Sequence, residues 1–306
     1  MRRRAFLASL ATAGALSAAC RRRKRTEAAA PSQSSDAAIA SYEIRDWELP
    51  TEPPSRPDGE RRCVVLVPRG LAPDAKVPLL IALHGMGETT SPRTGAYAWV
   101  ESYGLDRALA RLHHPPLGAA DFRGLVTPAR LAAINADLAK RPFGGLVIAC
   151  PYLPRGIGSE VPYDVYGTWL GERLLPKLRA EAPVIATPQA TGIDGVSLGG
   201  ITALRIGLSR ADLFGAIGAL QPAVLDETSD ALADTFAQRL GGRPLRIVTS
   251  TEDAFRDPIV ALGGKLAARK VPHELFVSEG PHDYVWNQGP GGIEMALWHD
   301  RALRAT

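Results

Sequence analysis

The chain has 306 residues, of which 45% are hydrophobic and 22% charged, a composition that supports a full hydrophobic core and excludes disordered and fibrous proteins. Its formal net charge is +4, and Arg2, Arg3 and Arg4 lie in a leader segment, so the remaining chain is close to neutral. This balance gives no electrostatic reason to expect a nucleic-acid partner, and the length favours one globular domain.

Residues 1–19 have the pattern of an export signal. The arginines at positions 2–4 precede an apolar, alanine-rich stretch that runs to Ala19. The segment from Arg3 to Leu7 resembles the twin-arginine signal, which directs the export of folded proteins. The apolar stretch is too short to span a bilayer comfortably, which takes about 20 residues. We therefore expect residues 1–19 to direct export.

Cys20 follows the letters LSAA in a pattern similar to a bacterial lipoprotein box, except that the leucine lies one residue further from the cysteine than usual. Acylation of Cys20 would anchor the protein to a membrane, facing the periplasm or the cell exterior. The alternatives are a signal that is cleaved, with secretion of the protein, and an uncleaved membrane anchor. The basic run 21–25 would then lie against anionic headgroups. Residues 26–40 are small and polar, as in a flexible tether.

From residue 41 to 306 short apolar runs alternate with longer helical patterns, which predicts a mostly parallel sheet covered by helices on both faces. We expect strands at residues 63–68, 78–85, 145–151, 190–197, 215–222, 245–250 and 273–278. Helices are expected near residues 94–112, 128–140, 164–180, 198–210, 229–240, 257–269 and 291–304.

Residues 104–145 form a long connection between two expected strands. Long connections after strand ends often form the rim of a site, and a surface excursion without a function is the alternative. His113 and His114 lie beside prolines in this segment, but no other ligand residues accompany them. We therefore expect no metal site there.

The segment Gly195-Val196-Ser197-Leu198-Gly199 has the G-x-S-x-G pattern, between an expected strand and an expected helix. Glycines on both sides of the serine allow a sharp turn that exposes its hydroxyl at the carboxyl end of the sheet. The pattern therefore predicts that Ser197 is a nucleophile, although such a short motif also occurs in ordinary turns.

A serine nucleophile needs a histidine to take its proton and an acid to orient that histidine, in the chain order serine, acid, histidine. Of the six histidines, His282 combines this order with a loop at the end of a strand. For the acid we expect Asp253, directly after residues 245–250, with Asp257 as the reserve because it precedes Pro258 and fits a helix cap. Asp283 fits a loop or surface residue better than the orienting acid.

Backbone N–H donors must stabilise the negatively charged oxygen that forms during acyl transfer. Leu198 opens the helix after the nucleophile and supplies one such N–H. The turn His84-Gly85-Met86-Gly87 follows a strand and is typical of a glycine-rich oxyanion turn, so we expect Met86 to supply the second. His84 is expected to be a structural residue of this turn.

Taken in order, the segments LHGMGE, GVSLGGITALRIGL, STEDAF and PHDYVW resemble the α/β-hydrolases, and more narrowly the secreted esterases similar to esterase D or to polyhydroxyalkanoate depolymerase. The segment DVYGTWLGERLLPKL is similar to the helix that precedes the nucleophile strand in those esterases. The resemblance covers about residues 60–300, with 104–145 the poorest fit. It implies an α/β-hydrolase fold for residues 41–306.

The resemblance and the site residues together predict a serine esterase without cofactor or metal, acting on small-molecule or polymeric esters. Two alternatives stay open: an acyltransferase on the same fold, and a lipoprotein that keeps the fold as a binding module without catalysis. The substrate is not named by the sequence. Five aromatic side chains are candidates for a substrate pocket, although aromatics at helical spacing are more often core: Tyr163, Tyr166, Trp169, Tyr284 and Trp286.

Cys63 and Cys150 remain once Cys20 is set aside. The strand order implied by the resemblance places their strands side by side and antiparallel, with the two cysteines at ends that meet. A disulfide is one expectation in an oxidising compartment. Two buried, reduced thiols are the other, because bridges between adjacent strands are geometrically demanding.

Overall fold

The computed structural model describes residues 41–50 and 60–304. The expected export signal, Cys20 and the tether lie outside these residues. Within the described part of the chain, no helix combines the length and the apolar character that crossing a membrane requires.

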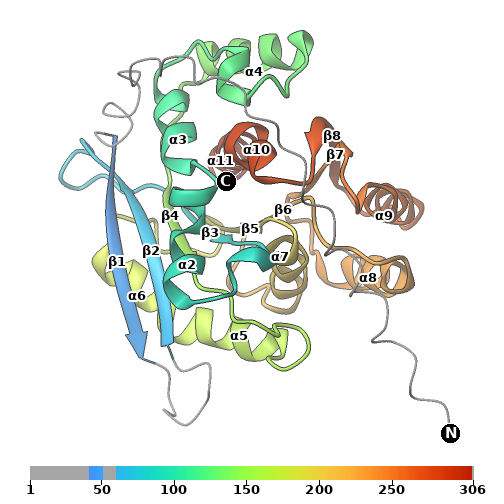
Figure 1. Cartoon of the computed structure of the whole chain (residues 1–306). Coiled ribbons are helices and arrows are strands. Elements are labelled where there is room, and N and C mark those ends of the chain that lie inside the picture. Colours follow the sequence, from blue (N-terminus) through green and yellow to red (C-terminus); the bar gives the residue numbers. More distant parts are fainter. Residues whose placement is uncertain (1–40, 51–59, 305–306) are drawn as a thin grey trace, which may run out of the picture. The chain divides into compact units, whose positions relative to one another are not determined.

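A single eight-stranded sheet organises the domain, with the strand order β1-β2-β4-β3-β5-β6-β7-β8 (Figure 1). Strand β2 is antiparallel to both of its neighbours, and the strands from β4 to β8 run parallel to one another. The mostly parallel sheet expected from the sequence is therefore confirmed. The strands are β1 Tyr42–Pro50, β2 Glu60–Pro68, β3 Leu79–Leu83, β4 Val147–Pro151, β5 Thr191–Gly195, β6 Ala216–Leu220, β7 Leu245–Glu252 and β8 Glu274–Pro281.

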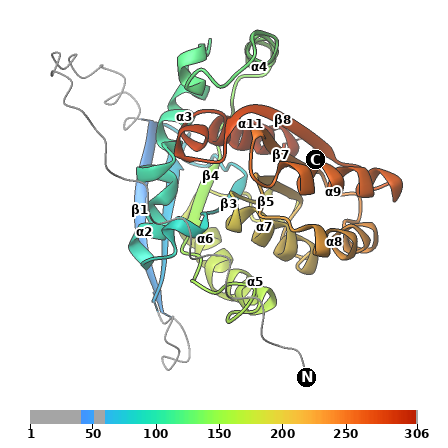
Figure 2. The same cartoon turned by 45° about the vertical axis from the view of Figure 1, so that its right-hand side comes forward.

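Helices cover both faces of the sheet, as Figures 1 and 2 show. Two separate clusters of buried side chains reflect this arrangement, because successive residues of a buried strand point to opposite faces. One face carries α2 Pro92–Tyr97, η2 Ala98–Ser102, α3 Leu105–His113, η3 Ala119–Phe122, α4 Pro128–Lys140, α10 Tyr284–Trp286, η5 Asn287–Gly291 and α11 Gly292–Ala302. The other carries α5 Tyr163–Trp169, η4 Leu170–Leu174, α6 Leu175–Glu181, α7 Leu198–Ser209, α8 Asp226–Arg239 and α9 Arg256–Ala268.

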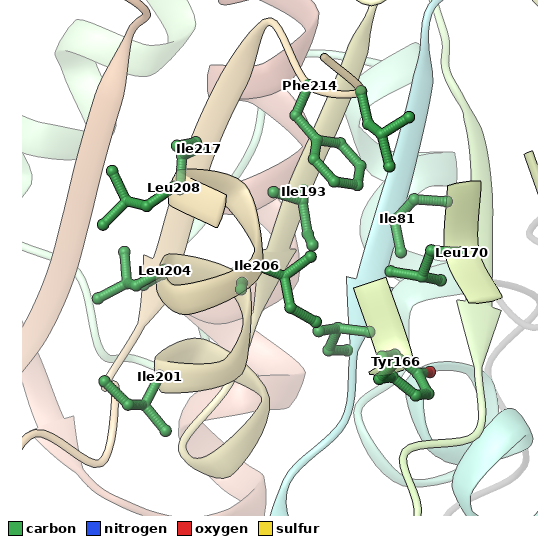
Figure 3. Close-up of a cluster of buried hydrophobic side chains, with 14 of the residues drawn as sticks. Ile81, Tyr166, Leu170, Ile193, Ile201, Leu204, Ile206, Leu208, Phe214 and Ile217 are labelled. Carbon is green, nitrogen blue, oxygen red and sulfur yellow. The ribbon is translucent and has the colours of Figure 1, made fainter. Parts of the chain in front are cut away.

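Helix α7 packs directly on the centre of the sheet (Figure 3). Its side chains Ile201, Leu204 and Ile206 meet those of the strands in one buried cluster, which includes Ile193 of β5 and Ile217 of β6. Burial of each such aliphatic side chain stabilises the fold by roughly 1.5–3 kcal/mol. The packing fixes the start of α7, which the expected nucleophile Ser197 directly precedes, against a rigid support.

Two of the differences from the sequence-based expectations concern β1 and the helix expected at 94–112. Strand β1 was not expected, because charged residues at positions 43, 45, 46 and 48 interrupt its apolar residues and the adjacent charges at 45 and 46 break the strict alternation typical of a strand; it pairs with β2 along its whole length. The helix expected at 94–112 is divided into α2, η2 and α3. The break falls at Gly104, whose φ of 63° is left-handed and ends the helix.

Cys63 and Cys150 are free, buried thiols, so the expected disulfide is wrong and the alternative holds. The register pairs Val64 with Cys150 and Cys63 with Pro151. Cys63 therefore points to the opposite face of the sheet from Cys150, and each belongs to a different buried cluster. Burial raises the pKa of both thiols.

The long connection 104–145 packs against the last residues of strand β8 and against the η5 segment that follows. A Cβ atom at Gly280 would lie 2.9 Å from a methyl group of Leu125, and one at Gly289 would lie 2.6 Å from the carbonyl oxygen of Phe122. The connection thus supports the segment that follows β8, and its role as a rim of the site stays a prediction. His113 packs edge-to-face against Phe143 within it.

Candidate active site

Ser197 occupies a strained turn between β5 and α7. Its φ of 57° and ψ of −114° are unusual for a residue other than glycine. The turn is held from both sides, because the Ser197 N–H donates to the Leu220 carbonyl at 3.0 Å and the Ser197 carbonyl accepts from Ala223 N–H at 3.0 Å. The surrounding backbone therefore imposes the conformation that the G-x-S-x-G pattern predicts.

The two glycines of this pattern are required by close backbone contacts. A Cβ atom at Gly195 would lie 2.6 Å from the carbonyl carbon of Gly199. A Cβ atom at Gly199 would lie 2.4 Å from the carbonyl oxygen of Leu83. Neither position tolerates a side chain, so the strand-to-helix turn can form only with glycine on both sides of the serine.

His282 and Asp253 meet at the ends of β8 and β7. The Nδ1 atom of His282 lies 2.8 Å from Oδ1 of Asp253. The same carboxylate accepts the Thr249 hydroxyl at 2.7 Å and the Phe255 N–H at 2.9 Å. A carboxylate acceptor places the proton on Nδ1, which leaves Nε2 of His282 available as a base.

Asp253 is held in its ionised form. Burial alone would raise the pKa of its carboxyl group, but the hydrogen bonds from His282, Phe255 and Thr249 outweigh it and lower the pKa below its usual value. The side chain of Asp253 has no exposed surface, whereas 24% of the His282 side chain is exposed. The pair therefore combines a buried, oriented acid with a histidine that solvent and a substrate can reach.

The other acidic candidates have different roles. Asp257 lies inside α9, its side chain is 90% exposed, and it pairs with Arg256 at 3.2 Å. Asp283 caps α10 by accepting the Trp286 N–H at 3.0 Å. The carboxyl ends of the parallel strands β5, β7 and β8 meet at one edge of the sheet, and this edge carries Ser197, Asp253 and His282.

The expected oxyanion donors both begin helices. Met86 is the first residue of η1, Met86–Glu88, and Leu198 is the first residue of α7, so neither N–H has an acceptor within its own helix. The N–H of Gly85, by contrast, donates to the hydroxyl of Tyr103 at 3.0 Å. A Cβ atom at Gly85 would lie only 3.8 Å from Cβ of Ser197, which places the turn against the nucleophile.

His84 is a buried, neutral residue of the oxyanion turn. Its Nε2 accepts the Leu153 N–H at 2.8 Å, so the proton lies on Nδ1, which donates to the Gly85 carbonyl at 2.8 Å. Burial lowers the pKa of His84 to about 4. Both ring nitrogens are thus used to hold backbone, in line with the structural role expected from the sequence.

Two polar groups of this region were not found by sequence reasoning. Gln221 follows β6 with a left-handed φ of 42°, and its buried amide donates to the Pro281 carbonyl, next to His282, at 3.0 Å. Glu88 is 3% exposed and accepts hydroxyl groups of two tyrosines. The position of Glu88, directly after a glycine-rich turn, is the sequence signal that could have singled it out.

A second histidine–aspartate pair lies in the core beneath the nucleophile. His299 Nε2 is 3.0 Å from Asp194 Oδ2, and both side chains are fully or almost fully buried. The other oxygen of Asp194 accepts the N–H of Gly195 at 2.7 Å. This pair therefore braces the end of β5, just before the turn at Ser197.

A cavity of about 530 Å³ lies between α4, β8 and α11, and neither Ser197 nor Asp253 nor His282 lines it. Charged side chains within it neutralise one another: Glu294 contacts both Arg130 and Arg246 at 2.6 Å, and Arg301 contacts Asp137 at 2.9 Å. The candidate chemistry lies instead at the carboxyl ends of the strands.

Of the aromatic residues that the sequence offers for a substrate pocket, Tyr166 and Trp286 are buried core residues, whereas Tyr284 is 50% exposed.

The order of the strands, their mostly parallel arrangement and the helices on both faces, together with the likeness to solved esterases, show the α/β-hydrolase fold, which confirms the expected fold class. A family model described as "Putative esterase" matches residues 158–286, a stretch that includes Ser197, Asp253 and His282 and agrees with the prediction of an esterase. No curated protein sequence matches the chain.

Solved structures with this fold include several esterases. One named as a ferulic acid esterase has a TM-score of 0.63 at 16% identity, over 86% of this chain and 99% of its own. A ferulic acid esterase from Anaeromyces mucronatus, in complex with ferulic acid, has a TM-score of 0.59 at 18% identity, over 87% and 92%. An S-formylglutathione hydrolase from Agrobacterium tumefaciens has a TM-score of 0.58 at 17% identity, over 86% and 96%.

Proposed function

We propose that the protein is a serine esterase that hydrolyses carboxylic esters through an acyl-enzyme, with Ser197, His282 and Asp253 as its catalytic triad. The observation that carries the proposal is the 2.8 Å contact between His282 and Asp253 at the sheet edge that also carries the strained turn of Ser197. The match to an esterase family over residues 158–286 supports the same activity.

In the first half of the reaction, Oγ of Ser197 attacks the ester carbonyl carbon while Nε2 of His282 takes the hydroxyl proton. The carbonyl oxygen becomes negatively charged, and the N–H groups of Met86 and Leu198 stabilise it. Each such donor contributes about 2.7–4 kcal/mol in comparable enzymes. The tetrahedral intermediate then breaks its bond to the alcohol oxygen, which leaves with the proton from His282.

In the second half, a water molecule gives a proton to His282 and attacks the acyl carbon. The bond to Ser197 breaks, the serine regains its proton from His282, and the carboxylic acid leaves. Asp253 stays ionised throughout and holds the imidazole in one tautomer. Its lowered pKa supports this role at neutral pH.

The proposal includes export and attachment to a membrane through Cys20. It rests on the sequence of residues 1–40 alone. Esters of aromatic acids are the first substrates to try, because ferulic acid esterases are among the proteins with this fold. Acyl-sugar and hydroxyalkanoate esters complete the substrate panel.

A fluorophosphonate probe tests the activity directly, because it phosphonylates only a serine that a neighbouring base activates. We expect the purified protein to be labelled at Ser197, as located by peptide mass spectrometry, and Ser197→Ala to lose both labelling and ester hydrolysis. Ser209→Ala, in the last turn of α7, is the matched control and should be labelled normally. A native protein that is not labelled would contradict the proposal and favour a binding module.

A further inference from the structure

Glu88 is a buried carboxylate directly beneath the oxyanion turn. It is the last residue of η1 and is 3% exposed. One of its oxygens accepts the hydroxyl of Tyr103, and the other accepts the hydroxyl of Tyr284 at 2.6 Å. A buried carboxylate is costly unless hydrogen bonds satisfy it, so both tyrosines are needed to keep it in place.

Tyr103 connects Glu88 to the oxyanion turn itself. Its hydroxyl donates to Glu88 and accepts the N–H of Gly85 at 3.0 Å. The His84–Gly85 peptide, one peptide before the one that carries the Met86 N–H, is thereby fixed, and Gly85 is removed from the set of N–H groups that could face a substrate. A Cβ atom at Gly85 would lie 3.2 Å from the Tyr103 hydroxyl oxygen, 3.4 Å from Glu88 and 3.8 Å from Cβ of Ser197.

Tyr284 connects Glu88 to the segment that carries the expected base. It lies two residues after His282 and 196 residues after Glu88 in the chain. Its ring centre is 5.9 Å from that of Tyr103, so the two tyrosines lie side by side over the turn. The hydrogen bond to Glu88, with burial and the charge of Glu88 adding to it, raises the pKa of Tyr284 to about 12, so its hydroxyl remains a donor at neutral pH.

We propose that Glu88 is a positioning residue that couples the oxyanion turn to the segment of His282 through Tyr103 and Tyr284. The inference rests on the proposed serine esterase activity. Without the carboxylate, no hydrogen-bonded link through the two tyrosines holds the oxyanion turn with Met86 at a fixed position relative to the segment of His282. Small misplacements of this kind cost up to about a hundredfold in rate in other enzymes.

Two variants test the coupling. Glu88→Gln replaces one acceptor oxygen with an NH₂ donor, so each tyrosine hydroxyl no longer has an oxygen of its own to donate to, and the negative charge that strengthens both hydrogen bonds is lost. Tyr284→Phe removes one of the two hydroxyls from a half-exposed ring and should leave folding intact. Tyr97→Phe is the matched control, because it removes a tyrosine hydroxyl that donates to Asp46 at 3.0 Å, away from the expected triad.

Steady-state hydrolysis of p-nitrophenyl acetate and inhibition by phenylboronic acid, which forms a tetrahedral adduct with an active serine, are measured for each variant. We expect kcat to fall about tenfold to a hundredfold in Glu88→Gln and Tyr284→Phe, with KM changed less than about threefold. The inhibition constant of phenylboronic acid should rise in parallel with the loss of kcat. The double variant should be no slower than Glu88→Gln alone, since both changes break one linkage.

The outcomes separate this proposal from the proposed function. If the wild type is labelled by fluorophosphonate at Ser197 but both variants keep kcat within about twofold, like Tyr97→Phe, the positioning role is overturned and the esterase stands. Effects that add in the double variant, or a loss confined to KM, also overturn it. A wild type that is neither labelled nor active overturns both proposals. Should Glu88→Gln fail to fold, Tyr284→Phe decides.

Discussion

Oδ1 of Asp253 lies 2.8 Å from Nδ1 of His282, whereas the carboxylate of Asp257, four residues further along the chain, points to solvent and pairs with Arg256. The two aspartates follow the same strand, and only their geometry separates them. We therefore expect Asp253→Asn to lower kcat by about 10⁴, because the amide favours the wrong tautomer of the histidine. Asp257→Asn should keep kcat within about twofold. Hydrolysis of p-nitrophenyl acetate measures both, and the reverse order of effects would reassign the acid.

The buried histidine of the oxyanion turn predicts a loss of stability in mild acid. The pKa of His84 is about 4 in the folded protein and 6.5 in an unperturbed histidine, so the unfolded chain gains a proton first as the pH falls. The free energy of unfolding should therefore decrease between pH 6.5 and pH 4, by on the order of 3 kcal/mol from this residue. Urea unfolding at several pH values measures it.

The matched variant for this prediction is His84→Gln, whose side chain does not titrate. Its stability at neutral pH should be lower, because two backbone hydrogen bonds are disturbed. Its stability should also vary less between pH 6.5 and pH 4 than that of the wild type. Equal pH dependence in the two proteins would show that His84 does not remain neutral in the fold.

The core pair of Asp194 and His299 leaves no room for a side chain at Gly218 of β6. A Cβ atom there would lie 1.9 Å from Oδ2 of Asp194 and 2.9 Å from Nε2 of His299. We expect Gly218→Ala to destabilise the fold by about 3 kcal/mol, since the buried pair must move or separate. Thermal and urea unfolding measure the change.

Gly264→Ala is the control for this substitution, because Gly264 lies in α9 and nothing is within 4 Å of its ideal Cβ. Alanine is the better helix former, so this variant should be more stable than the wild type by roughly 0.5–1 kcal/mol. If both alanine variants had the same stability, the tight space beside Asp194 would not matter to the fold.

The register between β2 and β4 predicts the behaviour of the two buried cysteines. Both thiols should resist maleimide in the folded protein, because they are buried and their pKa values are raised. In Cys20→Ser protein unfolded without a reductant, we expect mass spectrometry to find two maleimide adducts, on Cys63 and Cys150. Adducts that form only after reduction would demonstrate a disulfide and a different register.

The leader predicts where the protein is found in the cell. Replacing Arg3 and Arg4 with lysine should leave precursor in the cytoplasm, because the twin-arginine route requires the arginine pair. Cys20→Ser should move the mature protein from the membrane fraction to the soluble fraction, since the lipid attachment site is lost. Immunoblots of cell fractions measure both. Export that is insensitive to the arginine change would indicate the general secretory route.

The pattern of the sequence was sufficient for the positions of the parallel strands and for the turn around Ser197, because these depend on local periodicity and on glycine positions. The edge strand β1 was not predicted, because charged residues interrupt its apolar residues and make the segment resemble a loop. The sequence also did not predict the face of the sheet to which Cys63 points, because a shift of one residue in the pairing of β2 with β4 would place its side chain on the other face.

The contacts of Glu88 with Tyr103 and Tyr284 illustrate a second limit. Residues 88 and 284 are separated by 196 positions, and no local pattern indicates which tyrosine meets which carboxylate. Gln221 likewise joins the ends of three strands through its own side chain. Such contacts depend on the three-dimensional packing of strand ends, which a single sequence does not specify.

The free thiols of Cys63 and Cys150, on opposite faces of the sheet, make the folding of this domain independent of any oxidant. A domain that needs no covalent cross-link reaches its native state equally well in the reducing interior of a cell and outside it. A twin-arginine route accepts only cargo that has already folded. The placement of two cysteines in adjacent strands thus makes the domain compatible with maturation before translocation, with no later step of thiol oxidation.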